Sequence, residues 1–142
     1  MAGLRFVKPV SKVDLSSKVR HDPFAKLPYS VICRISFLIY DTTVPDFATA
    51  SWAVHSATRS KTSFWKSSLQ HNMAWFFEIQ ELMRLGALRR PEMFKGIFLW
   101  ANKKIWVSNG LKGPLMYVAN RRRIWSICED LGSTYQVGNK QR

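Results

Sequence analysis

The chain has 142 residues, with 22 Lys and Arg against 9 Asp and Glu, and a formal net charge of +13 at pH 7. This length is typical of a single domain with a core of its own, and the charge favours nucleic acid, anionic lipid headgroups or an acidic protein surface as a partner. Six Trp and nine Phe argue against a protein that binds phosphate backbones alone, because such binding depends on Lys and Arg, whereas Trp favours membrane and protein interfaces.

Residues 1–27 are predicted to form an extended, basic N-terminal arm. Pro9 and Pro23 interrupt it, and it has no sustained helical period. The stretch Met1–Arg20 holds five basic residues and only Asp14 as an acid, a composition typical of an organelle-targeting segment. The alternative is an ordinary basic arm that binds a partner. We expect no secretory signal peptide, because the first residues lack an apolar stretch.

The apolar stretch Pro28–Tyr40 is predicted to be a helix rather than a buried strand. Its residues Val31, Ile35 and Leu38 share one face at helical spacing. About fourteen residues at a rise of 1.5 Å span roughly 21 Å, which is less than the ~30 Å of a bilayer core. This helix is therefore too short to cross a membrane alone.

A further helix is expected from Pro45 to Ala57, followed by a polar hinge at Ser56–Ser63. Together with the preceding helix it would reach across a bilayer only with Asp41 and Asp46 near the middle. Buried carboxylates are costly in lipid unless they are paired, so this arrangement is not favoured.

Two strongly apolar helices, Ser63–Leu85 and Pro91–Val107, are predicted to form a hairpin at the centre of the fold. In the first helix, apolar side chains recur every three or four residues and so share one face. These residues are Trp65, Leu69, Met73, Phe76, Ile79 and Met83. Gly86 suits the left-handed conformation that ends a helix, and Pro91 suits the first position of the next one.

The last helix is predicted to run from Pro114 to Leu131, with Gly132 just past its end, followed by a polar tail at 133–142. An arginine triplet, Arg121–Arg123, interrupts its apolar residues. Because three consecutive helical residues point in different directions, at least one of them must face water, a phosphate or a partner carboxylate.

The sequence thus predicts a mostly α fold, namely an irregular helical hairpin or small bundle of three to five helices with extended N- and C-terminal arms. Residues 28–132 are expected to form the helical domain, between the N-terminal arm at 1–27 and the C-terminal tail at 133–142. No internal repeat is evident, and the short loops contain Gly and Pro.

No catalytic residue, cofactor or metal site is predicted, and we do not expect an enzyme or a small-molecule substrate. His21, His55 and His71 have no second ligand at a suitable spacing. Cys33 and Cys128 are expected to be two buried free thiols, with a single disulfide as the alternative. Two carboxylates at positions 78 and 81 are expected on the surface, bridged to Arg84 or to basic residues of a neighbour.

Two groups of residues are predicted to contact partners. Cations that would bind anionic lipid or an acidic partner are Lys103, Lys104, Arg121, Arg122 and Arg123. Aromatic anchors for an interface are expected to be Trp65, Trp75, Trp100, Trp106 and Trp125. The sequence between Met93 and Cys128 contains no acid, so the basic charge flanks the aromatic helices, as interfacial anchoring requires.

These features predict a non-catalytic accessory subunit of a large organellar membrane complex, such as a respiratory-chain or ATP synthase assembly. It would lie on the matrix side of the mitochondrial inner membrane and contact other subunits and anionic phospholipid. The alternative is an organellar ribosomal or other RNA-associated structural protein, in which the cations bind phosphates and the Trp residues stack on bases.

A short stretch also carries a family resemblance. The run Ile105–Leu111, followed by Asn120, Arg121 and Trp125, resembles the membrane-elongating peroxin family over less than a third of the chain. This resemblance implies association with a membrane.

Overall fold

The structure is a computed structural model that describes residues 22–60 and 63–139. Within these ranges it contains helices and no strand, which confirms the prediction of a mostly α fold. The α-helices are α1 (Tyr29–Leu38), α2 (Val44–Thr49), α3 (Trp52–Ser60), α4 (Ser63–Asn72), α5 (Phe77–Arg84), α6 (Pro91–Lys104) and α7 (Pro114–Asn139), and a short 3-10 helix, η1 (Val107–Asn109), follows α6. The predicted arm lies outside the described residues as far as position 21.

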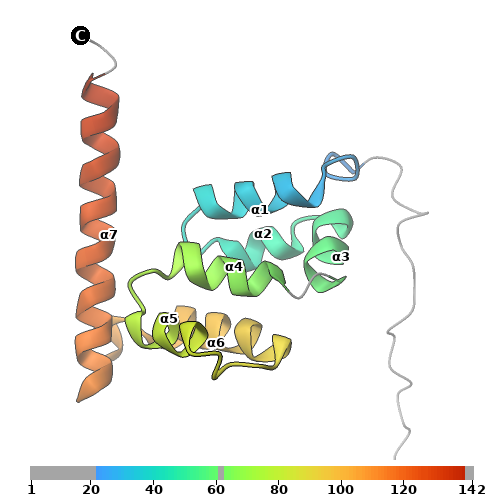
Figure 1. Cartoon of the computed structure of the whole chain (residues 1–142). Helices are drawn as coiled ribbons and strands as arrows, with labels where there is room; N and C mark the ends of the chain where they lie inside the picture. Colours follow the sequence, from blue (N-terminus) through green and yellow to red (C-terminus); the bar gives the residue numbers. More distant parts are fainter. Residues whose placement is uncertain (1–21, 61–62, 140–142) are drawn as a thin grey trace, which may run out of the picture.

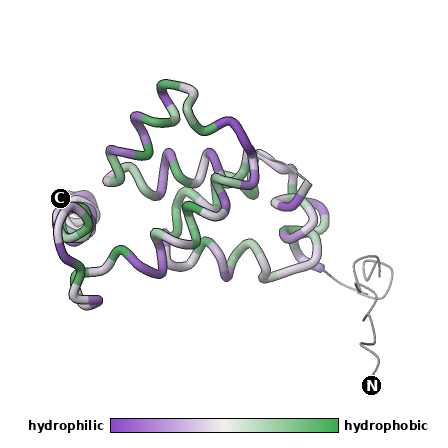
Figure 2. The backbone as a smooth tube through the Cα atoms, turned by 90° about the horizontal axis from the view of Figure 1, so that it is seen from below, coloured by the Kyte–Doolittle hydropathy of each residue, from purple (hydrophilic) through white to green (hydrophobic). Residues whose placement is uncertain are grey.

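The helices are arranged around α4, which packs against α1 on one side and against α6 on the other (Figure 1). α2 and α3 pack against each other beside this stack, and α5 follows α4 at the end of the stack near α7. α7 stands across this end and runs well beyond it (Figure 1). Seen from below, α7 is viewed along its axis beside the other helices (Figure 2). The described residues thus form a helical body with one projecting helix.

The core lies on both faces of α4. Phe64 and Leu69 of α4 are fully buried, together with Phe98 of α6 and Ile32 of α1. The ring of Trp65 meets that of Phe98 edge to face, with centroids 5.4 Å apart. Each fully buried side chain of this size contributes roughly 1.5–3 kcal/mol relative to leaving it exposed. Helix α4 therefore contributes buried side chains between helices that pack on two of its sides.

The single helix predicted from Ser63 to Leu85 is wrong, because the chain breaks between α4 and α5. Trp75 and Phe76 are buried in this break, with their rings stacked at 5.4 Å. Consecutive residues of a continuous helix would point these large rings in different directions. The cost of the break is offset by Gln80, whose Nε2 donates to the carbonyl oxygens of Leu69 (2.9 Å) and Met73 (3.0 Å) at the end of α4.

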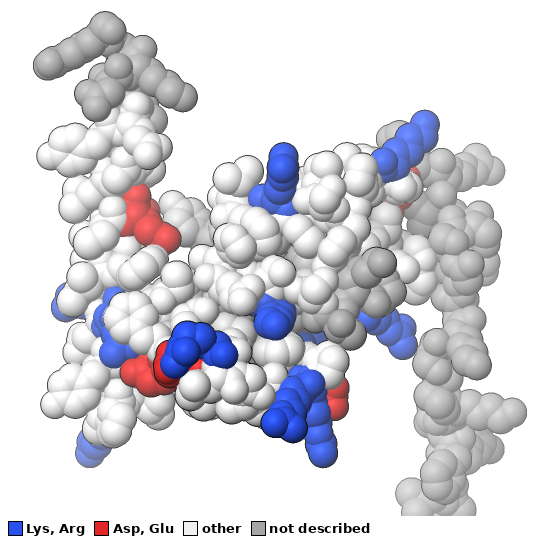
Figure 3. Space-filling model, in the orientation of Figure 1, with Lys and Arg blue, Asp and Glu red and all other residues white. Residues whose placement is uncertain are grey.

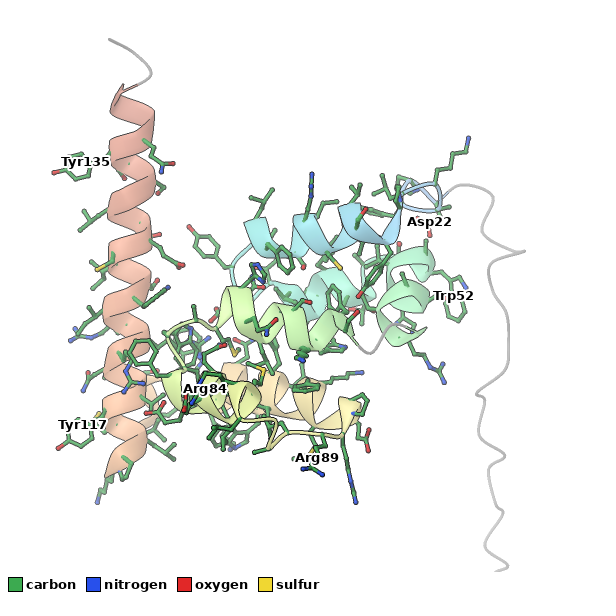
Figure 4. All side chains as sticks on the ribbon, in the orientation of Figure 1. Asp22, Trp52, Arg84, Arg89, Tyr117 and Tyr135 are labelled. Carbon is green, nitrogen blue, oxygen red and sulfur yellow. The ribbon has the colours of Figure 1, made fainter. Side chains whose placement is uncertain are left out.

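The N-terminus of α3 is fixed by two side-chain oxygens. The hydroxyl of Ser51 accepts a hydrogen bond from the Val54 amide (3.1 Å), and Oδ2 of Asp22 accepts one from the Ala53 amide (3.1 Å). Such caps satisfy amides that have no partner within a helix. Asp22 lies close to α3 although it is far from it in sequence (Figure 4). The helix expected from Pro45 to Ala57 is accordingly split into α2 and α3, with Ser51 at the boundary.

Helix boundaries set by Gly and Pro are partly confirmed. Gly86 has a φ of 67° and follows the end of α5, as expected, and Pro91 and Pro114 begin α6 and α7. The prediction that the last helix ends at Leu131 is wrong, because α7 continues through Gly132 to Asn139. Glycine adopts the helical conformation as readily as the left-handed one, so a glycine alone does not end a helix.

The second half of α7 has little support from the helical body, since every residue from Ser126 to Gln136 is exposed. Tyr40, which follows α1, reaches it with a hydroxyl that donates to Oδ1 of Asp130 at 3.4 Å. Among the described residues, no helix has both the length and the hydropathy that crossing a membrane requires.

We predict opposite effects of Ala at two glycines, each of which has open space where the added Cβ would lie. Gly132→Ala adds helix propensity of roughly 1 kcal/mol and should slow amide hydrogen exchange in the last turns of α7 about fivefold. Gly86→Ala forces a left-handed conformation on an L residue and should lower stability by roughly 1–2 kcal/mol. Faster exchange in Gly132→Ala would contradict a helix that continues through this residue.

Candidate functional site

The five predicted cations have three different environments. Lys103 and Lys104 at the end of α6 are exposed, and Arg123 on α7 is exposed as well. Arg121 is half-buried and Arg122 is buried. On the face drawn in Figure 3, Lys and Arg side chains are scattered over the surface rather than gathered into one basic patch. The structure therefore divides a group that the sequence presents as one.

The guanidinium of Arg122 donates four hydrogen bonds to oxygen atoms of other segments. Its Nη1 donates to the carbonyl oxygens of Ala101 (3.1 Å) and Ile105 (2.9 Å), near the end of α6. Its Nη2 donates to Oδ2 of Asp41 (3.1 Å) and to Oδ1 of Asn102 (2.9 Å). These bonds join α7 to the end of α6 and to the segment that follows α1.

Two tryptophan rings lie against the Arg122 guanidinium. Its Cζ is 3.7 Å from the ring centroid of Trp106 and 4.9 Å from that of Trp75. Burial lowers the pKa of Arg122 from its ordinary value, and the nearby carboxylate of Asp41 opposes this effect. Arginine stays protonated at neutral pH in proteins, so this is a buried ion pair. Arg122 is therefore an interior residue, and the surface contact predicted for it is not available to its guanidinium.

Arg121 fastens α7 to α5. Its Nη1 donates to Oε2 of Glu78 (3.0 Å), and its guanidinium lies 4.4 Å from the ring centroid of Phe77. Burial raises the pKa of Glu78, but the hydrogen bond and charge of Arg121 outweigh this, so that the pKa is lowered overall. Glu81 pairs with Arg84 at 2.6 Å, which confirms the predicted bridge on the surface of α5. Of the triplet, Arg123 alone has no partner among the described residues.

The predicted tryptophan anchors also separate into three groups, which are buried, half-buried and exposed. Trp65 and Trp75 lie in the core, 8% and 2% exposed, so they stabilise the fold and do not present an anchor at the surface. Trp125 is half-buried, with its Nε1 donating to Oε1 of Glu129 at 2.9 Å. Trp100 and Trp106 are exposed by 44% and 37%.

Exposed apolar residues and free cations meet on the side of α6 that faces away from α4. We call this surface the α6 outer face, and it consists of Met93, Leu99, Trp100, Lys103 and Lys104. Residues 93 and 100 are seven positions, or about two helical turns, apart and therefore lie on the same side of α6. The lysines lie in the last turn, where the negative end of the helix dipole favours cations.

The end of α6, which carries the two lysines of the α6 outer face, is capped by side-chain hydrogen bonds. Asn109 donates from Nδ2 to the carbonyl oxygens of Lys103 (3.3 Å) and Lys104 (2.9 Å). The indole Nε1 of Trp106 donates to the carbonyl oxygen of Asn102 at 2.6 Å. Carbonyl groups that a helix end leaves unpaired are thereby satisfied without water.

A cavity of about 430 Å³ lies between α7 and the ends of α1 and α4. Its aromatic lining comprises Phe37, Tyr40, His71, Trp75, Trp106 and Trp125. The Asp41–Arg122 pair forms part of its wall, and Arg123 and Glu129 line it from α7. His71 stacks on Phe37 with centroids 3.9 Å apart, and its Nδ1 lies 3.0 Å from the Ser67 carbonyl oxygen.

This lining contains no nucleophile hydrogen-bonded to a base in the part of the chain that the structure describes. No three His, Cys, Asp or Glu side chains gather around a possible metal position within 22–60 and 63–139. Cys33 and Cys128 are free thiols, as expected, but the prediction that both are buried is wrong, because Cys33 is half-buried and Cys128 is exposed on the second half of α7. Asp41 and Asn102 were not predicted as site residues. They lie 81 and 20 residues from Arg122 in the sequence, so no local sequence pattern indicates that they contact it.

Removal of the Arg122 charge should be strongly destabilising. Arg122→Met leaves Asp41 and two buried carbonyls without their donor, which should cost about 3–5 kcal/mol of unfolding free energy. Adding Asp41→Asn should recover part of this loss. Arg123→Met, at the exposed neighbour, is the control and should change stability by less than about 0.5 kcal/mol. Equal losses from the two arginine variants, measured by chemical denaturation, would contradict this assignment.

Comparison with known proteins does not place the chain in a family. No family model matches it, and no curated protein or solved structure is similar to it. The resemblance to the membrane-elongating peroxin family thus has no support from a family model.

Proposed function

We propose that this protein is a non-catalytic accessory subunit of a large organellar membrane assembly, such as a respiratory-chain or ATP synthase complex. It lies on the matrix side of the mitochondrial inner membrane, contacts its neighbours in the complex, and touches anionic phospholipid. The observation that carries the proposal is the α6 outer face, where exposed aromatic and aliphatic side chains adjoin unpaired lysines.

The chemistry of the α6 outer face suits a membrane surface. Trp100 presents a large ring with one polar edge, which favours the boundary between hydrocarbon and headgroups. Lys103 and Lys104 carry apolar stems that can lie on the same surface while their ammonium groups bind lipid phosphates. A phosphate backbone would need the cations but would leave Met93 and Leu99 exposed to water.

Two further features of the sequence support the location and the structural role. Met1–Arg20 is basic and poor in acids, as organelle-targeting segments are. No phosphate-binding loop, nucleophile elbow or metal-ligand spacing occurs in the chain, which argues for a structural rather than a catalytic subunit.

Fractionation of the organelle tests the proposal directly. We expect the protein to stay with membranes in high salt, to be released by mild detergent, and to run in a large complex on a native gel. Apolar contacts do not weaken with ionic strength, whereas phosphate contacts do. Release by salt or nuclease, or sedimentation with ribosomal particles, would overturn the proposal in favour of an RNA-associated protein.

Substitutions on the α6 outer face should weaken binding to anionic vesicles. Each lysine near an anionic surface contributes about 1 kcal/mol, so the Lys103→Glu, Lys104→Glu double variant should bind at least tenfold more weakly in a co-sedimentation assay. Lys26→Glu with Arg34→Glu is the matched control, because it makes the same change of charge at exposed positions near and on α1. Equal losses in both variants would mean that only net charge matters and would count against a defined lipid-binding face.

A further inference from the structure

Helix α7 presents an apolar stripe to the side away from the helical body. Tyr117 and Tyr135 both point outward on that side (Figure 4). They are 74% exposed, and Ile124 and Leu131, which lie between them, are 55% and 54% exposed. Nothing among the described residues covers this side of the helix (Figure 1). The stripe is therefore a surface that the helical body leaves without a partner.

The stripe has the spacing of a coiled-coil seam. Its residues, which we call the α7 seam, are Tyr117, Ile124, Cys128, Leu131 and Tyr135. Steps of three, four and seven residues keep them on one side of a helix and match the 3.5-residue repeat by which two helices pack lengthwise. Position 121 completes the pattern, and its arginine turns its guanidinium sideways to Glu78. The seam thus carries no unpaired charge.

We propose that two copies of this chain associate through the α7 seam, with their α7 helices side by side and antiparallel. The proposal goes beyond the lipid contact of α6 and does not depend on it, since the seam and the α6 outer face lie on different helices.

The order of residues along the seam fits a second copy of the same helix. The seam is symmetric about residue 126, so an antiparallel copy places Tyr117 opposite Tyr135 and Ile124 opposite Cys128. A two-fold axis requires this kind of self-complementary surface. Leu131 then lies opposite residue 121, where the arginine stem covers it. Every large side chain of the seam therefore meets a partner side chain.

Charge favours the antiparallel orientation over the parallel one. Of the arginine triplet, Arg123 alone has no partner among the described residues, and in a parallel pair the two Arg123 side chains would lie at the same height and repel each other. In the antiparallel pair residue 123 of one copy lies level with Glu129 of the other, next to Asp130. The two helix dipoles are then also opposed, which is the favourable arrangement.

The area that the seam would bury and the marginal stability of the second half of α7 also favour a second copy as the partner. Burying the exposed seam residues of two copies removes on the order of 1,000 Å² from water, which approaches the ~1,200 Å² at the lower end of specific interfaces. An unsupported helix of about fourteen residues is marginal in water, and Gly132 lowers its propensity further. Pairing along the seam would stabilise the part of α7 whose residues the helical body leaves exposed.

Sedimentation equilibrium of the full-length protein between about 1 and 200 µM tests the association. We expect a monomer–dimer equilibrium that Ile124→Lys with Leu131→Lys weakens at least tenfold. Leu85→Lys is the control, because residue 85 is equally apolar and 62% exposed but lies outside α7, and it should leave the equilibrium unchanged. A wild-type protein that is monomeric throughout would overturn the proposal, and so would a dimer that the seam variant does not weaken or a monomer that binds vesicles through the seam.

Crosslinking tests the orientation without disturbing the fold. In a Cys33→Ser background, Ile124→Cys should form an intermolecular disulfide with Cys128 of the second copy under mild oxidation, because these positions face each other. With residue 124 left as isoleucine, Cys128 should stay unlinked, since the two copies of Cys128 are offset along the axis by about four residues, or roughly 6 Å. Efficient linkage of Cys128 to itself would indicate parallel helices and overturn the antiparallel proposal.

Discussion

The ion pair between Arg122 and Asp41 is the contact that holds α7 against the rest of the helices. Taking a guanidinium out of water is costly, and here two carbonyls, an amide oxygen and a carboxylate offset that cost. The indole rings of Trp75 and Trp106 pack on the buried guanidinium, and the low dielectric around it strengthens its hydrogen bonds. One side chain of α7 thereby fixes the position of two other segments.

The remainder of the fold is held mainly by apolar burial around α4. Its two-sided core explains why the chain contains so many Phe and Trp residues for its length, since several of them fill the space between α4 and its neighbours. Composition alone therefore overstates how many aromatic residues are offered to partners. Trp100 and Trp106 are exposed, whereas Trp65 and Trp75 are part of the interior.

Local signals predict the helices better than their breaks. The helical periods, the start of α6 at Pro91 and the turn at Gly86 depend on neighbouring residues, and these predictions are confirmed. The break before α5 depends on burial of two aromatic rings against distant helices, which no local pattern contains. For the same reason the three arginines of α7 look equivalent in sequence. Their environments are decided by Glu78 and Asp41, which lie far away along the chain.

The uneven support of α7 gives this helix a mechanical property. It is fastened to α5, α6 and the segment after α1 through residues 121 and 122, while the residues from 126 to 136 are all exposed. A helix is stiff over this length, so α7 would move as a rigid lever. A force applied near Tyr135 would turn it about the point where Arg121 and Arg122 attach it to the other helices. Movement of the free end would be transmitted to the end of α6, because Arg122 is bonded to its final carbonyls.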